Sequence, residues 1–198
     1  HASNYFMSPF NDSSIITFDA FGEKESITFA SGNKNKIKKL WEQEFPHSLG
    51  SFYSALTEFL GFKPQSDEWK LMGASAYGNA DKYYKKLKKT YKILNKGFEL
   101  DLKYFNHYQF HRPKLFTNEL EKLLKLKANK LGSKLNKNYY DLAAASQRCF
   151  EDIYINLINQ IKKTNRSNNL VISGGCGLNS LVNGKILLKT SFKKIFIP

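Results

Sequence analysis

The stretch SGGCGLNSLVNG, residues 173–184, decides the fold class. It follows the apolar run Leu170-Val171-Ile172, which predicts a short buried strand, and it opens a segment with helical spacing from about 178 to 188. Adjacent glycines let the backbone approach a ligand closely, and a helix N-terminus presents unpaired N–H groups to phosphate. The spacing fits neither G-x-G-x-x-G nor Walker A. A nucleotide cradle and a tight strand-to-helix packing turn therefore both stay open.

The flanking segments extend this pattern in both directions. Apolar residues recur every three to four positions over 140–163, which predicts a long helix, and 195–197 reads as a strand. Nearer the N-terminus, 13–18 and 26–31 are β-rich and separated by a turn, so they predict an antiparallel hairpin. A helix is expected over 48–60, with Ser48 as its N-cap and Gly61 as its stop. We expect an α/β fold.

The composition bounds the class of protein. The chain has 198 residues, 41% hydrophobic and 15% aromatic, enough for one domain with a sizeable core, which excludes disordered and coiled-coil proteins. No apolar window reaches the length of a membrane span, and no signal peptide is evident. Cys149 and Cys176 form no disulfide framework and are expected to be free thiols, which suits a cytoplasmic protein with no membrane partner.

The charge is strongly basic, with 31 Lys and Arg against 17 Asp and Glu, a net +14. Runs at 34–39, 82–96 and 122–137 carry much of it, and two of them interleave lysines with apolar residues at helical spacing. Helices with a solvated basic face are favoured over an anionic partner. Arginine, which base recognition prefers, is scarce, so nucleic acid is not the expected partner.

Two further patterns could hold a metal. Asp19 ends the first strand beside a glycine turn, where a carboxylate can hold a metal, or a nucleotide phosphate through a metal. It can also cap the hairpin in an Asx turn, and the cap is favoured. His107 and His111 have H-x-x-x-H spacing, but the segment ends in Pro113 and lacks a completing ligand, so no metal is expected there.

Taken together, the segments resemble the O-carbamoyltransferases related to nodulation protein U and to the carbamoyltransferases of the tobramycin and cephamycin pathways. The motifs occur in order over nearly the whole chain: His1-Ala2 with Ser8-Pro9-Phe10, residues 16–23, 46–50 with 53–55, 60–63, 68–73 with Tyr77-Gly78, 141–144 with Gln147, and 173–175 with Leu178-Asn179 and 183–185.

This resemblance implies an actin-like ATPase-superfamily domain, related to ribonuclease H. Such a domain receives carbamoyl adenylate, which a separate YrdC-like domain makes from carbamoyl phosphate and ATP, and passes the carbamoyl group to a hydroxyl of a small molecule or sugar. By the same resemblance, His1 and Asp19 match metal ligands, with iron or a similar divalent ion as cofactor. Gly174, Gly175 and Asn179 match the nucleotide-binding turn, and Lys70 lies in a motif expected near the catalytic cleft.

The chain also departs from the family pattern. Ala20 replaces the usual glycine after Asp19, and Cys176-Gly177 replaces Val-Ala after the glycine pair. The chain begins at His1 rather than Met and lacks a YrdC-like segment. We therefore expect a piece of a larger protein, incomplete at both ends, with half of the metal shell outside it and no activity by itself.

Two alternatives remain open. A threonylcarbamoyl transferase acting on tRNA would use the +14 charge for phosphate contacts, so its tRNA affinity would fall steeply with salt. A non-catalytic module would bind adenine nucleotides without turnover.

Overall fold

The computed structural model describes residues 2–22 and 24–198, which form two compact units. The first unit contains the residues up to Gly50, Asn95–Gly97 and Ile153–Pro198, and the second contains Ser51–Leu94 and Phe98–Asp152. The candidate residues Asp19, Gly174, Gly175 and Asn179 all belong to the first unit, whereas Lys70 belongs to the second.

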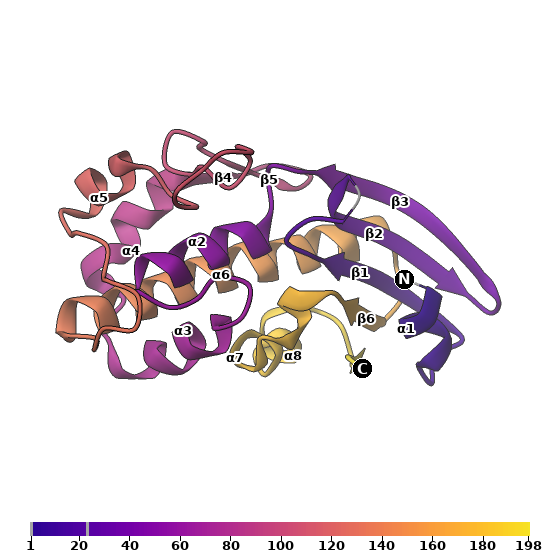
Figure 1. Cartoon of the computed structure of the whole chain (residues 1–198). Coiled ribbons are helices and arrows are strands. Elements are labelled where there is room, and N and C mark those ends of the chain that lie inside the picture. Colours follow the sequence, from indigo (N-terminus) through magenta and orange to yellow (C-terminus); the bar gives the residue numbers. More distant parts are fainter. Residues whose placement is uncertain (1, 23) are drawn as a thin grey trace. The chain divides into compact units, whose positions relative to one another are not determined.

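A five-stranded sheet forms the centre of the first unit, with the strand order β3-β2-β1-β6-β7. Its strands are β1 (Asp12–Phe18), β2 (Glu25–Asn33), β3 (Lys36–Glu44), β6 (Asn169–Ser173) and β7 (Lys194–Phe196). Figure 1 shows β1, β2 and β3 side by side, and these pair antiparallel, whereas β6 and β7 continue the sheet in parallel. The expected hairpin, the α/β class and the strands around 170–172 and 195–197 are therefore confirmed.

Both faces of this sheet bury apolar side chains. On one face Ile15, Ala30 and Val171 pack with Tyr5 of helix α1 (Ala2–Met7). On the other, the ring of Phe18 stacks on Tyr154 of helix α6 (Lys137–Thr164), with 4.4 Å between ring centroids. A strand buried on both faces is apolar in a continuous run, which explains Leu170-Val171-Ile172 of β6, whereas β1 buries Ser13 and Ser14 beside its two isoleucines.

The edge strand β3 contains the first basic run, to which the sequence analysis assigned no element. Five of its nine residues are charged, all but one of the nine are exposed or half-buried, and Lys39 pairs with Glu42 on the same strand. Charged side chains suit an edge strand because they discourage pairing with another chain. The absence of apolar alternation is the reason that the strand was missed.

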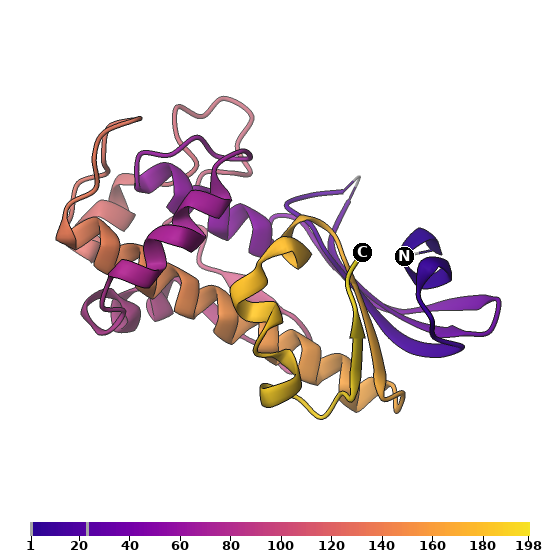
Figure 2. The same ribbon diagram turned by 90° about the horizontal axis from the view of Figure 1, so that it is seen from below.

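The segment after β6 differs from the single helix expected over 178–188. It forms a 3₁₀ turn, η3 (Gly175–Leu178), and two short helices, α7 (Ser180–Asn183) and α8 (Ile186–Lys189). Asn179 caps α7 with its side chain, and Gly184 ends it. The chain then returns to β7, which lies beside β6 (Figure 2). The expectation of a single helix was wrong, because Asn179 and Gly184 cap α7 at its two ends and so interrupt a segment whose apolar spacing is continuous.

The second unit is mainly helical and aromatic. Two helices extend into it from the first unit: α2 (Leu49–Phe59) belongs to the second unit from Ser51 on, and α6 belongs to it up to Asp152. Its other elements are α3 (Glu68–Ala74), η1 (Ser75–Tyr77), α4 (Asp81–Leu87), η2 (Lys88–Thr90), β4 (Tyr91–Ile93), β5 (Phe98–Leu100) and α5 (Asn118–Leu124). The ring of Phe52 meets the rings of Tyr91 and Phe105 edge-on. The helical expectation for 82–96 was therefore only partly right, because the helix ends at Leu87 and Tyr91 turns inward in a strand.

Two helices agree closely with the sequence. α2 and α6 begin and end within three residues of the bounds predicted from apolar spacing. Within residues 2–22 and 24–198, no helix combines the length and apolarity that crossing a membrane requires.

Candidate functional site

The carboxyl ends of β1 and β6 bring two of the predicted motifs together. The strands are parallel neighbours, and Thr17 lies opposite Ser173 in the pairing register. Both strands therefore end at the same edge of the sheet, and the turns that follow them contain Asp19 and Gly174. In open α/β sheets, ligands bind at this carboxyl edge.

Asp19 contacts the glycine turn directly. Its Oδ1 accepts a hydrogen bond from the backbone N–H of Gly175 at 3.1 Å, across 156 positions of sequence. The sequence analysis favoured a local cap for this carboxylate, whereas the structure gives it a long-range partner. Asp19 therefore links the turn after β1 to the turn after β6.

The backbone of Asp19 is held in place by the segment before α2. Ser48 donates its hydroxyl hydrogen to the carbonyl oxygen of Asp19 at 3.0 Å. Gly50 packs so closely on Ala20 that a Cβ at position 50 would lie 2.8 Å from the Ala20 backbone. The motifs at 16–23 and 46–50 thus meet here. Because residue 50 is a glycine, the backbone of Ala20 can lie against it.

Gly174 is required by both its conformation and its surroundings. Its φ is +87°, which side-chain-bearing residues rarely adopt, and a Cβ would lie 2.0 Å from the carbonyl oxygen of Phe18. Gly175 differs, because apart from its two chain neighbours no residue lies within 4 Å of the position that its Cβ would take. The turn is therefore closed against β1 at Gly174 and open at Gly175, where a ligand has room.

Asn179 has a structural role at the end of the same turn. Its side chain is 7% exposed, and its Oδ1 accepts the N–H of Val182 at 3.1 Å. This bond caps α7. Its predicted contact with a nucleotide stays a prediction.

Lys70 lies in α3 of the second unit. Its Nζ is 3.0 Å from Oδ1 of Asp67 and lies over the indole ring of Trp69. Hydrogen bonds from Lys70 and from the backbone N–H of Lys63 hold the pKa of the Asp67 carboxyl below its usual range. This pairing neutralises the ammonium locally, and the predicted catalytic role of Lys70 stays a prediction.

Of the two predicted metal ligands, His1 and Asp19, the structure describes only Asp19. Asp19 is present with a carboxylate oxygen at the site, whereas His1 lies outside the described residues. Residues 2–22 and 24–198 contain no group of three His, Cys, Asp or Glu side chains that could hold a metal ion. The described donors alone therefore do not form a complete metal shell. Neither Cys149 nor Cys176 is in a disulfide, as expected.

Asn4 is a site residue that the sequence did not indicate. Its Nδ2 donates to the hydroxyl oxygen of Ser173 at 2.6 Å, directly before the glycine pair. No motif links two residues 169 positions apart. Only the placement of α1 on the sheet reveals the contact.

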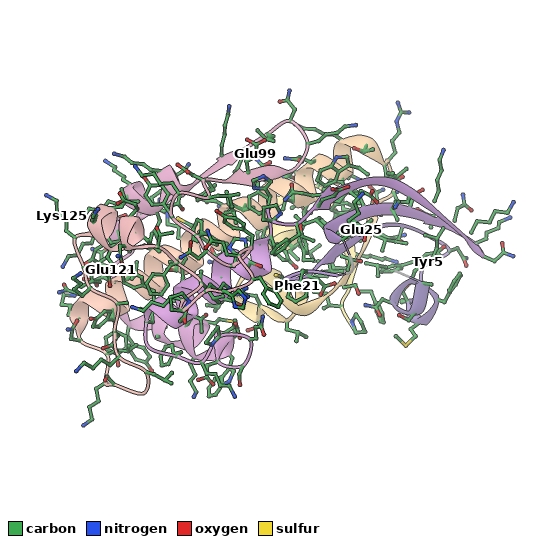
Figure 3. All side chains as sticks on the ribbon, turned by 45° about the horizontal axis from the view of Figure 1, so that its top comes forward. Tyr5, Phe21, Glu25, Glu99, Glu121 and Lys125 are labelled. Atoms are coloured by element: carbon green, nitrogen blue, oxygen red, sulfur yellow. The ribbon has the colours of Figure 1, made fainter. Side chains whose placement is uncertain are left out.

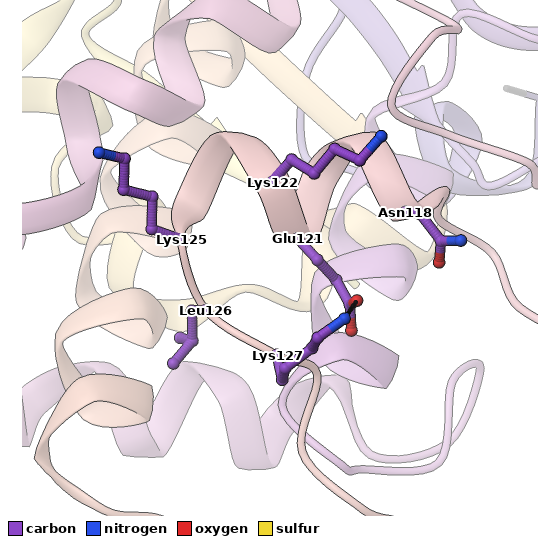
Figure 4. Close-up of a pocket in the computed structure, with 6 residues that line it drawn as sticks. All are labelled: Asn118, Glu121, Lys122, Lys125, Leu126 and Lys127. Atoms are coloured by element: carbon purple, nitrogen blue, oxygen red, sulfur yellow. Dashed lines mark hydrogen bonds and ion pairs between the residues drawn. The ribbon is translucent and has the colours of Figure 1, made fainter.

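The second unit contains a pocket of about 340 Å³ at the end of α5. It is lined by Asn118, Glu121, Lys122, Lys125, Leu126 and Lys127. Figure 4 shows Lys127 meeting Glu121, at 2.9 Å between Nζ and Oε2, whereas the ammonium groups of Lys122 and Lys125 point away in opposite directions. Because these ammonium groups do not converge on one point, the pocket does not form a site for an anion.

Comparison with known proteins places this geometry in a family. The chain is 34% identical over 198 residues to the protein sll1178 of Synechocystis and 28% identical over 198 residues to nodulation protein NolO of Bradyrhizobium diazoefficiens. These alignments cover 99% and 100% of this chain but 32% and 34% of the relatives, so the chain spans about a third of their length. A family model described as the carbamoyltransferase N-terminus matches residues 1–198, and the chain therefore belongs to that family.

Proposed function

We propose that this chain is part of a carbamoyltransferase that moves a carbamoyl group from carbamoyl adenylate to a hydroxyl of a small molecule or sugar. The observation that carries the proposal is the contact between Asp19 and the N–H of Gly175, at the carboxyl edge of β1 and β6, in a chain of this family.

The chemistry of that edge suits an acyl phosphate. Gly174 lets the backbone turn tightly against β1, and Gly175 leaves open space beside the turn. The N–H of Gly175 is held by Asp19 in this structure, and a phosphate bound beside the turn would compete for it or lie next to it. Backbone N–H groups at glycine turns stabilise phosphate oxygens and the negative charge that develops on a carbonyl oxygen. The adenylate itself would come from carbamoyl phosphate and ATP on a YrdC-like domain outside this chain.

In the proposed transfer, the acceptor hydroxyl oxygen attacks the carbamoyl carbon. A C–O bond forms to the acceptor, the bond from that carbon to the phosphate oxygen breaks, and AMP leaves. The hydroxyl proton passes to a base or through water. Neither a covalent enzyme intermediate nor a redox step is required.

The strand arrangement also supports the proposed actin-like fold. Three antiparallel strands, β1 to β3, are followed by parallel β6 and β7 on the other side of β1. The proposed divalent metal, with iron as the expected ion, would take Asp19 as one ligand and supply Lewis-acid stabilisation of phosphate charge. His1 would be a second ligand, and the remaining ligands would come from outside the described residues.

The experiment uses the full-length protein with ATP, carbamoyl phosphate, a divalent metal and candidate acceptors. Mass spectrometry follows carbamoyl adenylate and carbamoylated product separately. We expect Asp19→Ala to abolish transfer while adenylate still forms, because adenylate formation belongs to another domain. Asp12→Ala is the matched control, since Asp12 begins the same strand at its opposite end and accepts a hydrogen bond from Ser167 there.

Transfer by Asp12→Ala should remain close to that of the unchanged protein. If no carbamoyl adenylate forms under any metal, the carbamoyltransferase proposal fails. If Asp19→Ala transfers normally, the reaction does not use the edge of β1 and β6.

A further inference from the structure

Helix α1 is fixed on the sheet by one buried tyrosine. Tyr5 is 1% exposed, and its hydroxyl lies 2.9 Å from the carbonyl oxygen of Asn11 and 3.0 Å from that of Lys34. Its ring fills the space over Gly32, where a Cβ would lie 2.4 Å from a ring carbon. A helix of six residues is not stable alone, so this anchor determines where α1 lies (Tyr5 is labelled in Figure 3).

Tyr5 places α1 on the same face of the sheet as the side chains of Thr17 and Ser173, which precede the turns at the carboxyl edge. Tyr5 packs with Ile15 and Val171. Side chains two positions apart on a strand share a face, so Thr17 and Ser173 lie on this same face, nearer the carboxyl edge. The direct bond from Asn4 to Ser173 agrees with this placement.

The hydrogen bonds also orient the Ser173 hydroxyl. The Oδ1 of Asn4 accepts from the Ser3 hydroxyl at 3.3 Å, so the amide turns its donor, Nδ2, toward Ser173. The oxygen of Ser173 is therefore an acceptor in this pair and keeps its own hydrogen. Among the described residues that hydrogen has no acceptor, although Ser173 is only half-buried and directly precedes the open glycine turn.

We propose that Ser173 is a ligand-binding residue and Asn4 its positioning residue: Asn4 donates to the Ser173 oxygen, and the Ser173 hydroxyl donates to an oxygen of the phosphate held beside Gly175. Accepting one hydrogen bond makes a hydroxyl a stronger donor in the next. This inference rests on the proposed function, because it names a contact to the phosphate of the adenylate.

The test measures the affinity of full-length protein for AMP and for adenosine, which differ by the phosphate. Ser173→Ala should weaken AMP binding about tenfold, the usual effect of removing one hydrogen bond to a charged group, and leave adenosine binding unchanged. Asn4→Ala should weaken AMP binding less, because the hydroxyl remains but is no longer oriented.

A second variant tests the direction of the bond. Asn4→Asp keeps the shape of the side chain but replaces the donor with an acceptor that takes the Ser173 hydrogen. It should weaken AMP binding at least as much as Ser173→Ala. Met7→Asp, which adds the same charge at an exposed position of the same helix, is the control and should change AMP affinity less than about twofold at moderate salt.

Three results would overturn the inference. If Ser173→Ala binds AMP as tightly as the unchanged protein while Asp19→Ala loses transfer, the proposed function stands and the Ser173 contact is wrong. If Ser173→Ala weakens AMP and adenosine equally, the effect is structural. If the unchanged protein binds neither AMP nor ATP, the proposed function itself fails along with this contact.

Discussion

The carboxyl edge of β1 and β6 and the pocket at the end of α5 are opposite kinds of surface. The edge has little side-chain material: Gly174 has no room for a Cβ, Gly175 faces open space, and Asp19 reaches across to a backbone N–H. The pocket has a volume of about 340 Å³ and three lysines, but its one carboxylate, Glu121, is already paired (Glu121 and Lys125 are labelled in Figure 3).

The difference shows that volume and charge alone do not make a site. Burial by itself would raise the pKa of Glu121. Hydrogen bonds from the N–H of Ala128 and from the ammonium group of Lys127 have the larger combined effect, so the pKa is lowered. The polar groups of the pocket thus satisfy one another. At the strand edge Asp19 and the N–H of Gly175 are also paired, but Gly175 borders open space, which leaves room for a ligand beside the turn.

The largest expected effect breaks the edge itself. Gly174→Ala places a Cβ against the carbonyl oxygen of Phe18, at a residue whose φ is positive. We expect the free energy of unfolding to fall by about 3 kcal/mol and AMP binding to be lost. Gly175→Ala, which meets no atom, should keep the stability within about 1 kcal/mol. Urea unfolding of both variants measures this. Equal losses would mean that the turn is not held against β1.

A second prediction concerns two groups of the second unit, the half-buried Tyr84 hydroxyl and the buried Cys149 thiol. Burial, and its hydrogen bond to Asp152, raise the pKa of Tyr84 to about 12, and burial raises the pKa of the Cys149 thiol to about 12. The folded protein therefore holds these protons more tightly than the unfolded chain. The stability they contribute is fully present below their ordinary pKa values, 10.0 and 9.0, and is lost as pH rises through about 12.

The measurement is the urea midpoint between about pH 8 and pH 11. It should fall with rising pH in the unchanged protein and fall less in Tyr84→Phe, which has no hydroxyl to ionise. Tyr77→Phe is the matched control, because Tyr77 is 78% exposed, and it should follow the unchanged protein. A flat midpoint over this range would show that these groups are not buried as described.

The smallest effect is expected in the α5 pocket. Lys122→Ala and Lys125→Ala should each change stability by less than about 0.5 kcal/mol, because the ammonium groups are on the surface and Lys122 makes only an exposed pair with Glu119. AMP affinity should not change. A tenfold loss of AMP affinity in either variant would reverse the comparison between the pocket and the strand edge.

Much of the fold could be predicted because its signals are local. The apolar spacing of α2 and α6 follows from helical geometry, and the β-rich runs of β1 and β2 surround a turn. β3 was missed because an edge strand needs no apolar alternation. The segment after β6 was wrongly predicted as one helix, since Asn179 and Gly184 divide it with caps that apolar spacing does not indicate.

The residues of the candidate site could be predicted from the sequence, but the hydrogen bonds that join them could not. Glycine pairs and a carboxylate at a strand end are local signs, so Gly174, Gly175 and Asp19 could be named from the sequence. The bond between Asp19 and Gly175, the support from Ser48 and the contact of Asn4 with Ser173 join residues that are far apart in the chain.

The sequence by itself thus determined the α/β class, the main helices and strands, and a turn whose glycines leave the backbone free to approach a ligand. Only the tertiary structure decided that β1 and β6 lie side by side in parallel, and therefore that their two turns meet. Strand pairing depends on the burial of both sheet faces, by Tyr5 on one and Tyr154 on the other, and that burial is a property of the packed chain rather than of any short segment.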